Sequence, residues 1–255
     1  MRRLNPGMMM ASVAVLLLFI LLWHFVSVTR LVPATFLPSP TATYKALSNG
    51  FSRGQLSAST ASTVWRMLVG WGLACLVGIA LGCLIGMSER ARAYLAPMLE
   101  AIRPLPTSAL IPVFIAIFGL SEGMILGAIA FGAIWPMMLA TINGIAGIDP
   151  ALRDLAKSLK MSTLAFLTKI ALPSAMPEIM AAIRLGLTVA LVLAVVGEML
   201  SGRTGLGQWL LVSARSFATP NLFAGVVILG VIGFTANTCL QLFEARVLRW
   251  RQSAR

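Results

Sequence analysis

The sequence predicts an all-α protein that crosses a membrane about six times. Of its 255 residues, 58% are hydrophobic and only 11% are charged, which is more apolar surface than a soluble core of this size can bury. Several apolar runs also reach the roughly 20 residues that a helix needs to cross about 30 Å of hydrocarbon. Helices are expected because lipid offers the backbone no hydrogen-bonding partner.

The apolar runs divide the chain into six expected spans. They cover residues 8–28, 64–87, 105–120, 123–145, 178–200 and 222–243. The first run is longer than a typical signal-peptide core, so we expect it to remain as a spanning helix. The chain is therefore divided into a first helix with an outer loop (1–63), a transmembrane core (64–247) and a basic tail (248–255).

Prolines and small residues indicate where these spans are interrupted and where they pack closely. Prolines should break regular structure in the first half of segment 29–63, whereas residues 55–63 could begin the second helix outside the bilayer. Pro104, Pro106 and Pro112 interrupt the third span, which we therefore expect inside the bundle. The second span carries small residues at four-residue intervals, which predict close helix packing. They are Gly70, Ala74, Gly78, Gly82 and Gly86.

The basic residues predict how the chain lies in the membrane. Lys and Arg gather near both termini and in the loops around residues 88–104 and 146–177, and fewer occupy the opposite loops. The positive-inside rule places the richer loops and both termini in the cytoplasm, as expected for a multi-pass protein of the bacterial inner membrane. The net charge of +12 is thus explained by topology. The sequence shows no group of aromatic and basic residues of the kind that stacks nucleic-acid bases, so no nucleic-acid partner is expected.

Enzymatic chemistry is not expected on this chain. His24 is its only histidine, and Cys75, Cys83 and Cys239 lie in apolar runs without metal-binding spacing. The glycines between Gly202 and Gly207 lack the spacing of a nucleotide loop. We therefore predict no catalytic residue, no metal site and no cofactor on the chain.

The loop around residues 150–173 is the most informative stretch. Pro150 can start a short helix, on which leucines and one alanine recur along one face. The apolar face contains Leu152, Leu155, Ala156 and Leu159, and the other faces carry Arg153, Asp154, Lys157 and Lys160. Such a helix could rest on lipid headgroups or insert into a groove of a partner, and its amphipathic pattern alone does not favour either.

This loop resembles the cytoplasmic signature of the membrane subunits of binding-protein-dependent ABC importers. That signature reads Glu-Ala-Ala, three residues, Gly, nine residues and Ile-x-Leu-Pro. The positions that match are Asp154, Ala156, Ile170, Leu172 and Pro173. Leu155 replaces the usual Ala and Lys160 the usual Gly. Because glycine readily ends a helix in the left-handed conformation, either Lys160 accepts that conformation or the turn differs.

Four further segments resemble the permeases of the nitrate, sulfonate, taurine and bicarbonate uptake group. They are Leu37-Pro38-Ser39-Pro40, Arg103-Pro104-Leu105-Pro106, Gly197-Glu198 and Gly205-Leu206-Gly207. The resemblance implies a type I ABC importer permease fold. It further implies a small solute as cargo, with an anion such as a sulfonate, taurine or nitrate as the main expectation.

The resemblance also implies partners. The loop helix would be a coupling helix seated in a groove of a cytoplasmic ATPase subunit, which binds the ATP and Mg. The docking residues would be Leu152, Asp154, Leu155, Ala156, Lys157, Leu159 and Lys160, and the loop would end at Ile170, Leu172 and Pro173. A periplasmic or lipid-anchored binding protein, a second copy of the chain and membrane lipid complete the expected partners.

The translocation pathway has weaker candidates. An acid such as Glu198 is costly in an apolar span, so it either lines or gates the outer mouth or pairs with Arg66 or Arg203. Arg66 and Arg184 could attract an anion or anchor their helices, and Gly205 and Gly207 are expected to shape an outer turn beside the gate. Three alternatives stay open: an ion-gradient-driven carrier, a permease for a vitamin or pyrimidine precursor, and a non-transporting scaffold.

Overall fold

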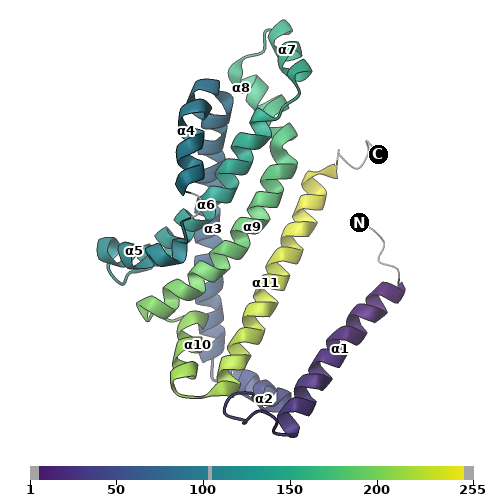
Figure 1. Cartoon of the computed structure of the whole chain (residues 1–255), viewed down its shortest axis with the longest axis vertical. Helices are drawn as coiled ribbons and strands as arrows, with labels where there is room; N and C mark the ends of the chain where they lie inside the picture. Colours follow the sequence, from purple (N-terminus) through teal and green to yellow (C-terminus); the bar gives the residue numbers. More distant parts are fainter. Residues whose placement is uncertain (1–5, 103–104, 250–255) are drawn as a thin grey trace.

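The protein was analysed as a computed structural model, which describes residues 6–102 and 105–249. The described chain is helical throughout and contains no strand (Figure 1). The α-helices are α1 (Pro6–Val28), α2 (Pro40–Ser52), α3 (Gln55–Met87), α4 (Glu89–Ile102), α5 (Ile111–Phe118), α6 (Glu122–Ala146), α7 (Pro150–Ser158), α8 (Thr163–Phe166), α9 (Leu172–Ser201), α10 (Leu206–Arg215) and α11 (Thr219–Val247). A 3₁₀ helix, η1 (Thr107–Leu110), precedes α5, and a π-helix, η2 (Leu167–Ala171), precedes α9.

Four of the described helices are long and apolar enough to cross a membrane. They are α3, α6, the continuous helix Thr163–Ser201 and α11. The expected spans 64–87, 123–145, 178–200 and 222–243 are therefore confirmed as membrane-length helices. The second begins at Gln55, as expected, so the boundary drawn between residues 63 and 64 falls inside α3. In α1 the described apolar stretch, Val13–Val28, is shorter.

Helix α6 lies at the centre of the bundle, packed against α3 and α9. The small residues of α3 form the contact with α6: a methyl group on Gly78 would lie 3.0 Å from the carbonyl oxygen of Ile134, and one on Gly82 would lie 2.8 Å from that of Met138. All members of the predicted ridge are buried. The prediction of close helix packing is therefore confirmed, and this packing holds α6 firmly in the bundle.

The third expected span, residues 105–120, does not form a membrane-length helix, because its helical part is limited to Thr107–Phe118. Helix α4 and the η1–α5 segment are bent by 82° relative to each other, and the eight residues of α5 cover about 12 Å, far less than the hydrocarbon thickness. Pro112 starts α5 as a new helix. Helix α5 projects from the bundle (Figure 1) with Ile117 and Phe118 exposed, whereas Ile111 at its start is fully buried in the core. Only the beginning of this segment therefore lies inside the bundle.

The fifth span starts earlier than expected. A continuous helix runs from Thr163 to Ser201, and the side chain of Ser162 caps its start by accepting a hydrogen bond from the backbone N–H of Ala165 at 3.2 Å. Pro173 lies in the first turn of α9, directly after the π-helix η2. The wider π-turn accommodates a residue that lacks an N–H and would clash with the preceding turn of an α-helix. The predicted loop end at Ile170, Leu172 and Pro173 thus falls inside this helix.

The two ends of the bundle differ in their short elements (Figure 1). Helix α7 lies at one end, beyond the end of α11, and helices α2 and α10 lie at the other. Helix α2 was not expected because of its prolines, yet Pro40 occupies its first turn and the side chain of Ser39 caps it. Helix α1 leans away from the bundle. Its C-terminal part is anchored by Trp23, whose indole N–H donates to the carbonyl oxygen of Pro38 at 2.9 Å.

Candidate functional sites

Helix α7 is a well-capped short helix. The side chain of Asp149 accepts a hydrogen bond from the backbone N–H of Ala151 at 2.9 Å, and Pro150 follows this cap. At the other end, the N–H of Met161 donates to the carbonyl oxygen of Ala156 at 3.0 Å, and the N–H of Lys160 donates to that of Lys157 at 2.9 Å. These bonds form a Schellman turn in which Lys160 has a φ of 48°. Lys160 therefore accepts the left-handed conformation.

The inner face of α7 packs against its own chain. Ala156 is buried and lines a cavity of about 310 Å³ together with Met87, Met161 and Phe166. The expected apolar stripe is therefore divided, because Ala156 turns inward while the leucines point elsewhere. A small side chain at position 156 allows α7 to approach the ends of α3 and α8.

The outer face of α7 exposes leucines. Leu152 is 39% exposed, Leu155 52% and Leu159 64%, although each is apolar and α7 stands at the tip of the bundle (Figure 1). Asp154 is also exposed and is paired only loosely with Lys157, at 3.3 Å. The exposed part of α7 thus combines apolar anchors with one acid and the cations Lys157 and Lys160, a composition suited to a complementary protein surface.

Arg153 joins α7 to a transmembrane helix, a role that the amphipathic pattern did not predict. Its guanidinium Nη2 donates to the carbonyl oxygens of Ile145 at 2.9 Å and Ala146 at 3.1 Å. Those carbonyls belong to the last turn of α6, where no intrahelical donor is left for them. The contact therefore attaches the loop helix to α6.

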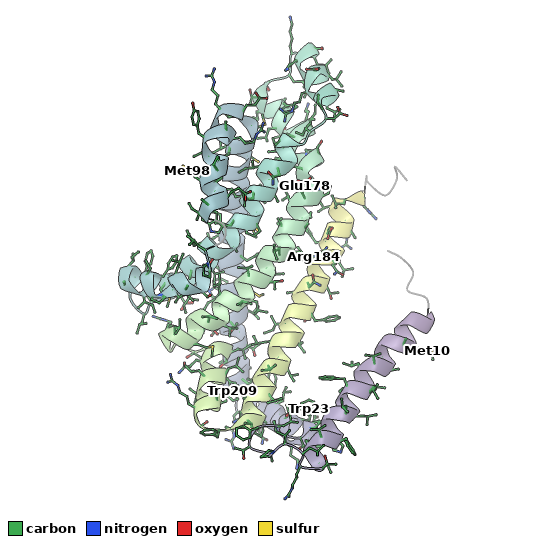
Figure 2. All side chains as sticks on the ribbon, viewed as in Figure 1. Met10, Trp23, Met98, Glu178, Arg184 and Trp209 are labelled. Atoms are coloured by element: carbon green, nitrogen blue, oxygen red, sulfur yellow. The ribbon has the colours of Figure 1, made fainter. Side chains whose placement is uncertain are left out.

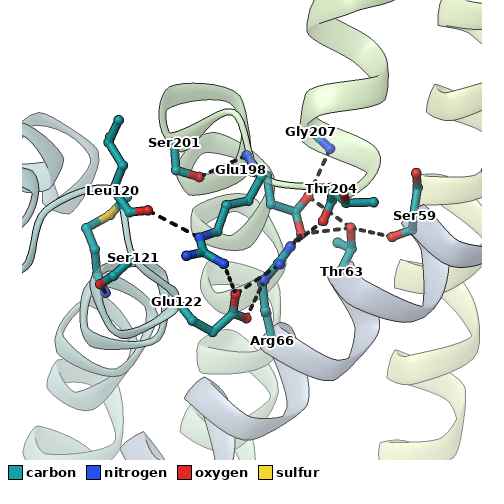
Figure 3. A network of polar contacts seen from close by, with 12 residues as sticks. Ser59, Thr63, Arg66, Leu120, Ser121, Glu122, Glu198, Ser201, Thr204 and Gly207 are labelled. Atoms are coloured by element: carbon teal, nitrogen blue, oxygen red, sulfur yellow. Dashed lines mark hydrogen bonds and ion pairs between the residues drawn. The ribbon is translucent and has the colours of Figure 1, made fainter.

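A second cluster of polar residues surrounds Glu122 at the start of α6, which is the end of that helix away from α7 (Figure 3). Glu198 on α9 is completely buried. Its carboxylate accepts hydrogen bonds from the Nη1 of Arg66 at 2.8 Å, the hydroxyl of Thr63 at 2.9 Å and the backbone N–H of Gly207 at 2.9 Å. Of the expected alternatives for Glu198, the structure contains the pairing with Arg66.

Arg66 connects this carboxylate to further elements. Its Nε and Nη2 donate to the two carboxylate oxygens of Glu122 at 2.6 and 3.0 Å, and its Nη1 donates to the carbonyl oxygen of Thr204 at 2.7 Å. Arg203 lies 3.5 Å from Glu122. Two guanidinium groups thus balance two carboxylates and join α3, α6, α9 and the segment before α10. We call these four residues, with Thr63, the outer network.

Glycines allow the segment before α10 to approach the outer network. A methyl group on Gly207 would lie 2.9 Å from the Cβ of Glu198, and one on Gly205 would overlap the Glu198 carboxylate. The N–H of Leu206 between them donates to the hydroxyl of Thr63 at 2.8 Å. Gly205 and Gly207 therefore serve close packing around Glu198.

The outer network leaves Glu198 and Arg66 without a free surface for a solute in this conformation. Sequence reasoning gave pairing with Arg66 or Arg203 as one alternative for Glu198 but missed Thr63 and Glu122. Glu122 could have been found, because Ser121 followed by an acid marks a helix start. Arg184 does not join the network: it lies on α9 beside α11 (Figure 2), where it pairs with Glu244. Arg103 and Pro104 lie outside the described residues.

A cavity of about 770 Å³ lies between α3, α9 and α11. Its lining is almost entirely apolar and includes Met67, Trp71, Leu187 and Phe243, with no charged side chain among the described lining residues. Such walls offer nothing that would recognise an anion. The described chain thus presents two sites with distinct chemistry: the leucine face of α7 and the outer network.

The chain is similar in sequence to known membrane transport proteins. Residues 76–251 match the family of binding-protein-dependent transport system inner membrane components. The chain is 32% identical to a permease from Bacillus subtilis (strain 168) named for aliphatic sulfonates transport, over 92% of this chain and 85% of the relative. It is 27% identical to the taurine transport system permease protein of Escherichia coli (strain K12), over 94% and 89%.

A solved structure supports the fold. The inward-facing methionine ABC transporter MetNI contains a chain with a TM-score of 0.66 and 15% identity, covering 76% of this chain and 96% of that one. At that identity the likeness concerns the fold alone. The predicted all-α, multi-pass type I importer architecture is confirmed. The chain belongs to the family of binding-protein-dependent transport system inner membrane components and is the permease subunit of an ABC importer.

Proposed function

We infer that this permease is driven through α7 by a separate ATPase subunit that docks on Leu152, Leu155 and Leu159. The observation that carries the inference is the division of α7 into a buried inner face and an exposed leucine face. Apolar side chains at the centre of a protein contact are the usual source of its affinity. The exposed Asp154 would add a polar contact beside them.

The amphipathic pattern also allows α7 to rest on a lipid surface. Helices that rest on headgroups bury their apolar side at the level of the bundle ends and are flanked by cations. Helix α7 stands beyond the ends of its neighbours (Figure 1), and its exposed cation Lys157 is accompanied by the exposed acid Asp154. Both features favour a protein groove. The ATPase would hold ATP and Mg, and the permease itself would hydrolyse nothing.

The assembly follows from the same inference. Two copies of the chain would enclose the pathway, and a binding protein would deliver the solute at the end of the bundle that carries α2 and α10. The distribution of Lys and Arg supports an inner-membrane orientation with α7 and both termini in the cytoplasm. Closure of two ATPase subunits on ATP would draw the two α7 helices together and turn the pathway outward.

The cargo that we propose is an aliphatic sulfonate. The two relatives described above are named for aliphatic sulfonates and for taurine, and both names denote a small sulfonate. Ethanesulfonate is a suitable probe. Proteoliposomes with the permease, its cognate ATPase and its binding protein should import it only with ATP on the ATPase side.

This experiment also separates the alternatives. Permease alone with a proton or sodium gradient should import no ethanesulfonate, whereas uptake under that condition would identify a gradient-driven carrier. ATP-dependent uptake of a vitamin or pyrimidine precursor in place of ethanesulfonate would retain the ATPase-driven mechanism and contradict the sulfonate proposal. Absence of uptake for all of them would point to the non-transporting scaffold.

Docking itself is tested by Leu155→Glu. A carboxylate forced into an apolar contact loses hydration without gaining a partner, so the ATPase recovered with the affinity-purified permease should fall at least about tenfold, equivalent to about 1.4 kcal/mol. Leu155→Met should retain it. Leu164→Glu is the matched control because Leu164 is also exposed but lies on α8. Unchanged recovery with Leu155→Glu would contradict the docking proposal.

A further inference from the structure

The connection between α6 and α7 is short and fixed. It comprises residues 147–149, in which the N–H of Gly147 donates to the carbonyl oxygen of Asn143 at 2.8 Å. Ile148 is buried in a cluster with Cys83, Ala171 and Ile179. Asp149 then caps α7. A connection of this kind leaves α7 little freedom to move without its neighbours.

Arg153 adds a direct bond across this connection. Its Nη2 caps the last turn of α6 through two carbonyl oxygens, at 2.9 and 3.1 Å. A cation at a helix C-terminus also interacts favourably with the helix dipole. The Nη1 of the same guanidinium lies 3.8 Å from Glu89 at the start of α4, but Glu89 is well exposed, so this pair contributes little. The bond to α6 is the stronger attachment.

Helix α6 is suited to carry a displacement along its whole length. Buried residues recur from Met124 near its start to Ile145 in its last turn, and it packs against both α3 and α9. Its first residue, Glu122, is held by two hydrogen bonds from Arg66 in the outer network. A guanidinium therefore holds α6 at each end, Arg153 beside α7 and Arg66 at the opposite end.

We propose that Arg153 is a positioning residue that transmits movement of α7 to α6, and through α6 to the outer network. The proposal rests on the proposed docking of the ATPase on α7. It assigns docking and transmission to opposite faces of the helix: the leucines bind the ATPase, and Arg153 passes its movement to the membrane. Removing Arg153 should therefore separate ATP hydrolysis from import while the ATPase remains bound.

The test uses the complete transporter, with Arg153→Ala compared with Arg153→Lys and Arg90→Ala. The number of ATP molecules hydrolysed for each ethanesulfonate imported should rise about tenfold in Arg153→Ala, within the range typical of coupling between sites. Lysine retains the charge and part of the cap, so Arg153→Lys should restore part of the coupling. Arg90→Ala removes an exposed arginine at the same end of the bundle and should match the wild type.

Two further measurements distinguish a transmission role of Arg153 from a role in docking. ATPase recovery with Arg153→Ala should equal that of the wild type, and hydrogen exchange in residues 143–147 should become faster because the cap on α6 is lost. Unchanged coupling in Arg153→Ala would overturn the transmission role. Loss of ATPase binding in Arg153→Ala would also overturn it, since Arg153 would then act in docking. Failure of Leu155→Glu to release the ATPase would instead contradict the proposed docking.

Discussion

At the scale of single residues, the outer network concentrates charge in a buried place. Glu198 has its carboxylate surrounded by an arginine, a hydroxyl and a backbone N–H, which together replace the water that it loses. Arg66 is likewise divided between two carboxylates and a carbonyl oxygen. These bonds explain why an acid is tolerated in an apolar helix without any contact with a solute.

Removing one partner of this pair should be costly. Glu198→Ala leaves Arg66 buried without one of its two carboxylates, so the free energy of unfolding should fall by about 3 kcal/mol. Thermal unfolding of the purified permease in detergent measures the loss. Glu178→Ala is the matched control, because Glu178 lies on the same helix but is exposed. Equal midpoints for the two variants would show that the network does not stabilise the fold.

Lys160 is the second residue with a measurable cost. Its left-handed φ of 48° is unfavourable for a residue with a Cβ by about 1 kcal/mol, and glycine avoids that cost. Lys160→Gly should therefore raise the thermal midpoint of the permease, whereas Lys169→Gly, a matched replacement inside the π-helix, should lower it. A lower midpoint for Lys160→Gly would mean that the lysine side chain supplies more than its backbone conformation costs.

At the scale of elements, α7 shows what a periodic pattern can and cannot predict. Pro150 and the leucine spacing were sufficient to predict a short helix, because both act within a few residues. They were not sufficient to orient it. Ala156 faces its own chain because Met87 and Phe166 lie there, and Met87 comes from α3, which is distant in sequence. The pattern therefore grouped one buried residue with three exposed ones.

Prolines had opposite effects in two other elements. In residues 105–120 the expected span became η1 and the short α5, with Pro106 directly before η1 and Pro112 in the first turn of α5. In residues 163–201 the helix continued through Pro173 and Pro177, with a π-turn before the first of them. The same residue type permits either outcome, and the choice depends on tertiary packing that the local sequence does not contain.

At the scale of the whole molecule, the chain places its two sites at opposite ends of one central helix. Four of the six expected spans are membrane-length helices, and hydropathy could predict them because it acts through solvent and not through specific partners. Charge alone gave Arg66 as one of two possible partners for Glu198. The contacts of Thr63 with Glu198 and of Glu122 with Arg66 could not be predicted, since they depend on the packing of α3, α6 and α9. The cap by Arg153 depends on the turn between α6 and α7, which the amphipathic pattern does not describe.

The most direct test of this account is to find which face of α7 touches the ATPase. A photo-reactive benzoylphenylalanine placed at Leu155 should crosslink the permease to the ATPase in the assembled transporter, and the same group at Phe166, which lines the inner cavity, should crosslink only within the permease. Bands are resolved by gel electrophoresis and assigned by mass spectrometry. Crosslinks to the ATPase from position 166 but not from position 155 would contradict the orientation of α7 and the docking proposed for its leucines.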